Sequence, residues 1–208
     1  MTRFSNEERA VFKKLSDPRK IQDFLTTIQS DERRQQFVRS PRLVLRDKKA
    51  YCLEGALFAA CALAFHGEKP LLLDLVADKI DDGHVVALYK RNGYWGAISK
   101  TNHATLRFRD PIYKTVRELA LSYFHEYFVN RNGEKTLKTY SEPVNLRALG
   151  KKWMTSEEDI WYVNEALDRA KHTPLVPREN VGYLRRADPI EREAGAMQEW
   201  EDGKRVMY

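Results

Sequence analysis

The spacing of apolar residues is helical through the first fifty residues. Residues 21–28 place Ile, Phe, Leu and Ile at i, i+3, i+4 and i+7, which gives one amphipathic face. Two helix-start signals accompany it. Ser5 is followed by Glu8, a capping box, and Asp17 is followed by Pro18, a cap with proline at the first helical position. We therefore predict a helical N-terminal layer.

The next segment is apolar on nearly all sides. Residues 51–66 are rich in alanine and carry few charges, and Gly67 follows them as a stop signal. A helix that is apolar all round is a buried helix. The pattern therefore predicts a helix in the centre of the fold.

Short apolar runs follow the central helix and predict a small antiparallel sheet. The predicted strands cover residues 71–76, 84–90, 94–99 and about 105–109. The dipeptide Asn92-Gly93 lies between the second and third strands and is a strong hairpin signal. Asp110 and Pro111 end the fourth strand. The expected fold class is α+β, with a buried helix packed on the sheet and additional helices.

Two further helices and a tail complete the prediction. Residues 116–127 keep helical spacing, and Thr155 with Glu158 forms a capping box ahead of another apolar stripe. From residue 172 onward, prolines and charges dominate without periodicity, which predicts an extended or partly disordered tail. The expected organisation is one domain, in which the layer 1–50 covers a core with flanking helices at 51–171, followed by the tail 172–208.

Composition excludes several classes of protein. Of 208 residues, 42% are hydrophobic, which is enough for a sizeable core. The 36 basic and 30 acidic residues give a net charge of +6, but the two signs are interspersed. Such a pattern is typical of a solvated surface rather than a nucleic-acid footprint, and no DNA- or RNA-binding motif supports a footprint. Nucleic-acid binding is therefore a minority interpretation.

The sequence also predicts where the protein works. The longest apolar run, Ala56 to Phe65, is far shorter than the ~20 residues of a membrane span. The charged N-terminus has no apolar leader region, and two cysteines cannot form a disulfide framework. We expect a cytoplasmic protein with no membrane partner. No metal-ligand spacing or phosphate-binding glycine loop occurs, so no cofactor is expected.

Cys52 is the candidate nucleophile. It opens the alanine-rich helix, where free backbone N–H groups and the helix dipole stabilise a thiolate and are expected to lower the pKa of the thiol. Cys61 lies about half a turn round the helix and about 13.5 Å along its axis, so the two sulfurs cannot pair. Cys61 is interpreted as a core residue. A cysteine taken alone is more often a small buried hydrophobe, so the assignment of Cys52 as a nucleophile needs further support.

His84 supplies that support as the candidate base. It follows Asp81, Asp82 and Gly83 and begins an apolar strand. A histidine at the start of a strand exchanges protons while the sheet holds its backbone, although a partly buried polar residue would fit the same position. A helix-start cysteine followed by a strand-start histidine is the arrangement of a cysteine–histidine acyl-transfer site.

Several short motifs carry a resemblance over residues 51–110. They are Cys52, Glu54, Ala56 and Leu57, then Gly67 to Pro70, Gly83, His84, Gly93, Tyr94 and Trp95. In order and spacing they resemble the transglutaminase-like superfamily, whose papain-like core carries a Cys-His-Asp triad. The resemblance implies a hydrolase or acyltransferase that attacks an amide or ester, on a protein or peptide substrate, through a thioester.

The third triad residue departs from the family pattern. No carboxylate follows Trp95 closely, so Asn102, Ser99 and Asp110 are the candidates. A two-residue turn at Asn92-Gly93 would bring Ser99 to the face of His84, whereas a three-residue loop with a glycine bulge would bring Asn102 there. We predict Asn102, because an amide oxygen accepts the imidazole N–H more rigidly than a hydroxyl. Ser99 ranks second and Asp110 third.

The alternative interpretation is a catalytically inactive binding domain of the same fold. Its partner, a protein or a nucleic acid, would bind a basic surface formed by Arg107, Arg109, Lys114 and Arg117. An RNA-binding accessory protein is a third hypothesis, which the net charge favours only weakly.

Overall fold

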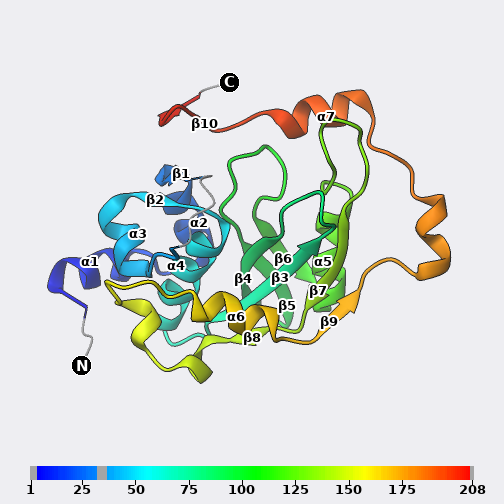
Figure 1. Cartoon of the computed structure of the whole chain (residues 1–208). Coiled ribbons are helices and arrows are strands. Elements are labelled where there is room, and N and C mark those ends of the chain that lie inside the picture. The colour runs from blue at the N-terminus through cyan, green and yellow to red at the C-terminus, as the bar shows by residue number, and fades with distance from the viewer. Residues whose placement is uncertain (1–3, 32–36, 207–208) are drawn as a thin grey trace.

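The computed structural model describes residues 4–31 and 37–206, which form an α+β fold (Figure 1). The helices are α1 (Asn6–Lys14), α2 (Pro18–Thr27), α3 (Pro41–Asp47), α4 (Cys52–Phe65), α5 (Val116–Phe124), α6 (Tyr162–Asp168) and α7 (Pro189–Ala196). Short 3-10 helices are η1 (Leu146–Leu149), η2 (Lys152–Met154) and η3 (Arg178–Tyr183). The strands of the main sheet are β3 (Leu71–Ala77), β4 (His84–Arg91), β5 (Tyr94–Ile98), β6 (Arg109–Tyr113), β7 (Leu137–Ser141), β8 (Val144–Asn145) and β9 (His172–Pro174).

The main sheet is antiparallel and seven-stranded. Its order is β6-β5-β4-β3-β7-β9, and β8 pairs with β3 beyond the end of β7. Two small pairs lie outside it: β1 (Gln29–Ser30) runs parallel to β2 (Lys49–Ala50), and β10 (Trp200–Glu201) forms a hairpin with β11 (Lys204–Arg205). Strand β4, which begins at His84, lies in the interior of the sheet.

The sheet separates two hydrophobic cores. Helix α4 packs on one face and is surrounded by α1, α2 and α3, so residues Leu53 to Leu63 are buried all round the helix (Figure 1). On β4, Val85 and Ala87 belong to this core. Val86 and Leu88 face the opposite core, which α5 covers. This two-sided burial explains why the sequence of α4 shows no amphipathic stripe.

Several predictions from local sequence signals are confirmed. Ser5 and Glu8 form a capping box at α1, and Asp17 caps α2 with Pro18 at its first position. Across the hairpin, Arg91 pairs with Tyr94, so Asn92 and Gly93 form a two-residue turn. Their φ angles of 50° and 88° are those of a type I′ turn.

Two predicted boundaries are wrong. The fourth strand spans Arg109–Tyr113 rather than residues 105–109, and it contains Pro111. Because β6 is the edge strand of the sheet, a proline there removes no hydrogen bond that the sheet needs. The capping box of Thr155 with Glu158 starts no helix. Thr155 ends η2, the Glu158 N–H donates to the Ser156 hydroxyl at 3.2 Å, and α6 begins only at Tyr162.

The predicted tail is a structured segment over residues 172–206. It adds β9 to the main sheet, forms η3 and α7, and crosses the molecule to the β10–β11 hairpin (Figure 1). Asp188 and Glu191 form a capping box at α7, with Pro189 in the first turn. This is the kind of start signal that identified the N-terminal helices. The high charge and the prolines of this segment favoured the interpretation as a tail, so the start signal of α7 was not identified from the sequence.

No helix within residues 4–31 and 37–206 combines the length and the apolar character that a membrane span requires.

Candidate active site

Cys52 is the first residue of α4 and is half-buried. The backbone N–H groups of Leu53, in its own helix, and of Val85, in β4, lie close enough to its sulfur to favour the thiolate. The Val85 N–H belongs to the peptide that joins His84 to Val85. The Cys52 sulfur therefore lies beside the backbone at the start of β4. The His84 side chain, however, shares the face of Val86 and Leu88 on the α5 side of the sheet, so the structure does not bring the thiol and the imidazole together.

The prediction that the pKa of the Cys52 thiol is lowered is wrong. Burial raises the pKa of Cys52 to about 11, and the negative charges of Asp74 and Glu54 add to the effect. The N–H groups of Val85 and Leu53 favour the thiolate but do not outweigh burial. The cost of removing the thiolate charge from water exceeds the stabilisation that the helix N-terminus provides. In the resting state Cys52 is a neutral thiol.

His84 is buried, and its ring is oriented by Ser99. The His84 Nε2 atom lies 2.7 Å from Ser99 Oγ, and the Ser99 hydroxyl lies 2.6 Å from the carbonyl oxygen of Leu106. A carbonyl can only accept, so the single hydroxyl proton goes to Leu106 and the hydroxyl must accept from Nε2–H. In a neutral ring with a proton on Nε2, Nδ1 carries the free lone pair of a base.

The neutral form of that ring is also the stable one. Burial lowers the pKa of His84 to about 4, and the positive charge of Arg109 acts in the same direction. The Leu106 carbonyl favours the protonated ring but does not reverse the shift. His84 is therefore an uncharged imidazole at neutral pH and is available as a general base.

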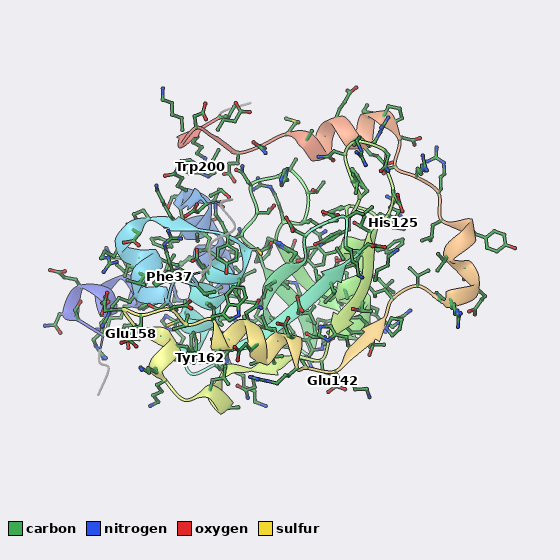
Figure 2. The ribbon with its side chains drawn as sticks, in the orientation of Figure 1. Phe37, His125, Glu142, Glu158, Tyr162 and Trp200 are labelled. Carbon is green, nitrogen blue, oxygen red and sulfur yellow. The ribbon has the colours of Figure 1, made fainter. Side chains whose placement is uncertain are left out.

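The hairpin register selects Ser99 and corrects the choice of Asn102. With Arg91 opposite Tyr94, the two-residue turn forms and the glycine-bulge register does not. The Asn102 amide instead bonds the backbone of Trp200, donating from Nδ2 at 3.0 Å and accepting at Oδ1 at 2.8 Å. Trp200, labelled in Figure 2, belongs to the C-terminal segment. Asp110, the third candidate, is exposed on β6.

Helix α2 fixes Ser99 from outside the sheet, which the sequence did not reveal. The Gln22 side chain donates from Nε2 to the Ser99 carbonyl at 2.9 Å and accepts the Ser99 N–H at Oε1 at 3.0 Å. The predicted N-terminal layer thus contributes directly to the placement of Ser99. A lone glutamine on an amphipathic helix carries no signal for such a contact, because the two residues are far apart in the chain.

A cavity of about 310 Å³ opens beside His84. It is formed by the loops 80–84, 101–106 and 126–130, with Gly195 of α7 at its rim. The described residues that line it include His84 and His103 but not Cys52. A larger cavity of about 700 Å³ lies beside the β10–β11 hairpin, and its described lining contains neither Cys52 nor His84. The smaller cavity therefore reaches the candidate base, whereas the candidate nucleophile lies outside its described lining.

The predicted basic surface is largely engaged within the protein. Arg107 forms an ion pair with Glu199 at 3.1 Å, and Arg109 forms one with Glu126 at 2.7 Å. The side chain of Arg117 donates to backbone carbonyls of the β9 region. Lys114 is exposed. Because carboxylates neutralise two of the arginines, the four residues do not form the open cationic surface that the binding-domain alternative assumed.

In the part of the chain that the structure describes, no cluster of three or more His, Cys, Asp or Glu side chains is arranged to hold a metal ion. Comparison of the chain with protein-family models and with curated proteins finds no match.

Proposed function

We propose that the protein is a cysteine-nucleophile hydrolase or acyltransferase of transglutaminase-like type, acting on an amide or ester through a thioester on Cys52. One observation carries the proposal. The Cys52 sulfur lies at the peptide N–H that follows His84, while the Ser99 hydroxyl holds the His84 proton on Nε2 and leaves Nδ1 as a base. The thiol thus lies beside the backbone of the strand start whose side chain is the proposed base.

The neutral resting states of Cys52 and His84 define how the first step proceeds. Since thiol and imidazole are both neutral, His84 Nδ1 removes the thiol proton as the sulfur attacks the carbonyl carbon, rather than before it. The described residues include no hydrogen bond between the Cys52 sulfur and the His84 ring, which faces the α5 side of the sheet. The proposal therefore requires the His84 side chain, at the first position of β4, to turn toward Cys52 when substrate binds. The backbone N–H of Cys52, at the start of α4, is the proposed donor to the oxyanion.

The remaining steps balance without a cofactor. The protonated His84 returns its proton to the leaving amine or alcohol, and a thioester remains on Cys52. Water or an amine then attacks the thioester, with His84 again accepting a proton, and the thiol is regenerated on release of the acyl product. Water gives a hydrolase and an amine gives a transferase.

Acyl-enzyme trapping with p-nitrophenyl acetate tests the proposal. We expect a burst of nitrophenol and one acetyl group on Cys52, detected by mass spectrometry of the digested protein. C52A should lose both signals, whereas C61A, a cysteine variant of the same helix, should keep them. Equal nitrophenol release by wild type and C52A, with no acetyl group on Cys52, would overturn the proposal.

The inactive binding domain is favoured by one observation, the raised pKa of the Cys52 thiol. A thiol that stays protonated at neutral pH is a poor nucleophile unless a base acts on it. The trapping experiment separates the two functions, because a binding domain forms no acyl-enzyme.

A further inference from the structure

Two histidines line the cavity of about 310 Å³, and in each ring one nitrogen is fixed by a hydrogen bond within the protein. The His84 Nε2–H donates to the Ser99 hydroxyl, which leaves Nδ1 as an acceptor. The His103 Nδ1 atom lies 3.1 Å from the carbonyl oxygen of Gly195. Since a carbonyl oxygen only accepts, this nitrogen carries a proton, and in the neutral ring of His103 the Nε2 atom is the acceptor.

Neither acceptor nitrogen has a hydrogen-bond partner in the part of the chain that the structure describes. In that part, the polar side-chain atoms that are both sealed from solvent and without a partner belong to Thr155, Tyr162, Arg192 and Trp200. The His84 Nδ1 atom is therefore open to solvent although the residue is only 5% exposed, and the space that His84 lines is this cavity. Such a lone pair is satisfied by a ligand that donates a hydrogen bond.

The charged side chains of the lining are carboxylates. Asp81, Asp82 and Glu126 line the cavity, and its described lining contains no lysine or arginine. The charge of Glu126 is matched by the ion pair with Arg109. The Asp81 carboxylate accepts the Asp82 N–H at 2.9 Å and the Thr136 hydroxyl at 2.5 Å, but forms no ion pair within the described residues. Asp81 therefore gives this cavity a negative charge beside the two acceptor nitrogens.

The other walls of the cavity restrict the ligand further. They include the apolar or aromatic side chains of Ile80, Leu106, Tyr127, Phe128 and Val129. An anion would meet the lone pair of His84 and the charge of Asp81, and an apolar ligand would leave both without a partner. A volume of about 310 Å³ lies at the small end of ligand pockets. The ligand that fits is therefore a small cation with N–H donors.

We infer that the cavity beside His84 binds a guanidinium group. A guanidinium carries its positive charge together with five N–H donors in one plane, so that one group serves several acceptors on different loops. An ammonium has three donors around a compact, strongly hydrated charge, and it costs more to move from water into a cavity with apolar walls. In the bound state Asp81 faces the charge, and His84 Nδ1 and His103 Nε2 accept N–H bonds.

This site goes beyond the proposed reaction, because Cys52 does not belong to its described lining. It uses the nitrogen of His84 that the proposed reaction needs as a base. A guanidinium on Nδ1 holds the His84 ring on the α5 side of the sheet and should therefore slow formation of an acyl-enzyme on Cys52. Binding itself requires no thiol.

An NMR titration of the ¹⁵N-histidine-labelled protein with butylguanidine at millimolar concentrations tests the inference. We expect the His84 Nδ1 and His103 Nε2 resonances to shift saturably, because an acceptor nitrogen responds directly to a new hydrogen bond. Butylurea has the same shape without the charge and should bind about tenfold more weakly. Butylamine keeps the charge with fewer donors and should also bind more weakly. The peptide acetyl-Gly-Arg-Gly-amide distinguishes an arginine side chain, which binds more tightly than butylguanidine, from a small free guanidine, which the peptide does not surpass.

Asp81→Asn removes the charge from the lining and keeps the shape of the side chain. We expect this substitution to weaken binding of butylguanidine about tenfold and to change binding of butylurea little. Asp78→Asn is the matched control and should keep full affinity. Asp78 also accepts a backbone N–H, that of Lys79, and pairs with Lys138 at 3.1 Å, but does not belong to the described lining of the cavity.

Butylurea binding as tightly as butylguanidine to the wild-type protein would overturn the inference, even if Asp81→Asn does not fold. So would full affinity in a folded Asp81→Asn protein, or shifts that spread over the whole surface without saturation. Butylamine binding as tightly as butylguanidine would overturn the choice of a guanidinium. C52A should bind butylguanidine as the wild-type protein does. If it binds while the wild-type protein forms no acyl-enzyme, the proposed function fails and the guanidinium site stands.

Discussion

The two cysteines of α4 show how far one helix can differ between its first turn and its middle. Cys52 is half-buried, and its pKa responds to the N–H groups of Leu53 and Val85 and to the carboxylates of Asp74 and Glu54. Cys61 is 1% exposed, and burial alone is the main cause of its raised pKa. The same side chain is part of a polar cluster in one place and a small core hydrophobe in the other, so position along the helix decides its chemistry.

Alkylation of the folded protein is the sharpest measure of this difference. We expect iodoacetamide to label Cys52 at least about 10³ times faster than Cys61, because Cys61 becomes accessible only when the core opens. Labelling of Cys52 should still increase with pH where an ordinary thiol has levelled off, since its pKa is raised to about 11. Denaturant should bring the two rates together. Equal labelling rates of Cys52 and Cys61 without denaturant would show that the two thiols have similar environments.

The proposed reaction depends on the orientation of the His84 ring, and Ser99→Ala tests it. Loss of the hydroxyl leaves Nε2–H without its acceptor, so the ring can rotate or adopt the other tautomer. We expect kcat for p-nitrophenyl acetate to fall by about 100-fold, and the ¹⁵N spectrum of His84 to show mixed tautomers. Asn102→Ala, which removes the contact to Trp200, should keep kcat. The opposite pattern would restore Asn102 as the orienting residue.

Local signals in the sequence predicted the elements that build this site. The alanine-rich pattern identified α4, and Asn92-Gly93 identified the hairpin, because a type I′ turn needs two residues that tolerate positive φ. The same rule determined the register that brings Ser99 toward His84. The preference for Asn102 failed because it weighed the chemistry of an amide above the turn that Asn92-Gly93 favours.

Other features of the site depend on contacts that local patterns do not encode. The Leu106 carbonyl, which fixes the Ser99 proton, lies in an irregular loop where Leu106 itself has a φ of 60°. The Asn102 amide is held by Trp200, 98 residues away in the chain. The cost of burying Cys52 depends on packing from several elements, so its pKa could not follow from the helix position alone.

At Gly55, the first turn of α4 packs too closely against Lys100 to admit a larger residue. A Cβ at Gly55 would lie 2.3 Å from Lys100 Cβ and 2.9 Å from Lys100 Cγ. Although alanine favours a helix by about 1 kcal/mol over glycine, we expect Gly55→Ala to cost about 2 kcal/mol in the free energy of unfolding, measured with urea. Gly182→Ala, with open space around it, is the control and should be nearly neutral. A more stable Gly55→Ala protein would show that the helix and Lys100 can separate.

The smallest expected effect isolates the environment of the two sulfurs. Cys61→Ser places a hydroxyl in a dry core and should cost about 1 to 2 kcal/mol, reduced from a full desolvation penalty because a helical serine can bond the carbonyl four residues before it. Cys52→Ser keeps an acceptor for the Val85 and Leu53 N–H groups, at a helix start that tolerates serine, and should cost less than about 1 kcal/mol. Since the chemical change is identical, the difference between the two urea midpoints measures polarity at the two positions. Equal losses would mean that the first turn is as dry as the middle of α4, and that the N–H groups beside Cys52 do not stabilise a polar atom there.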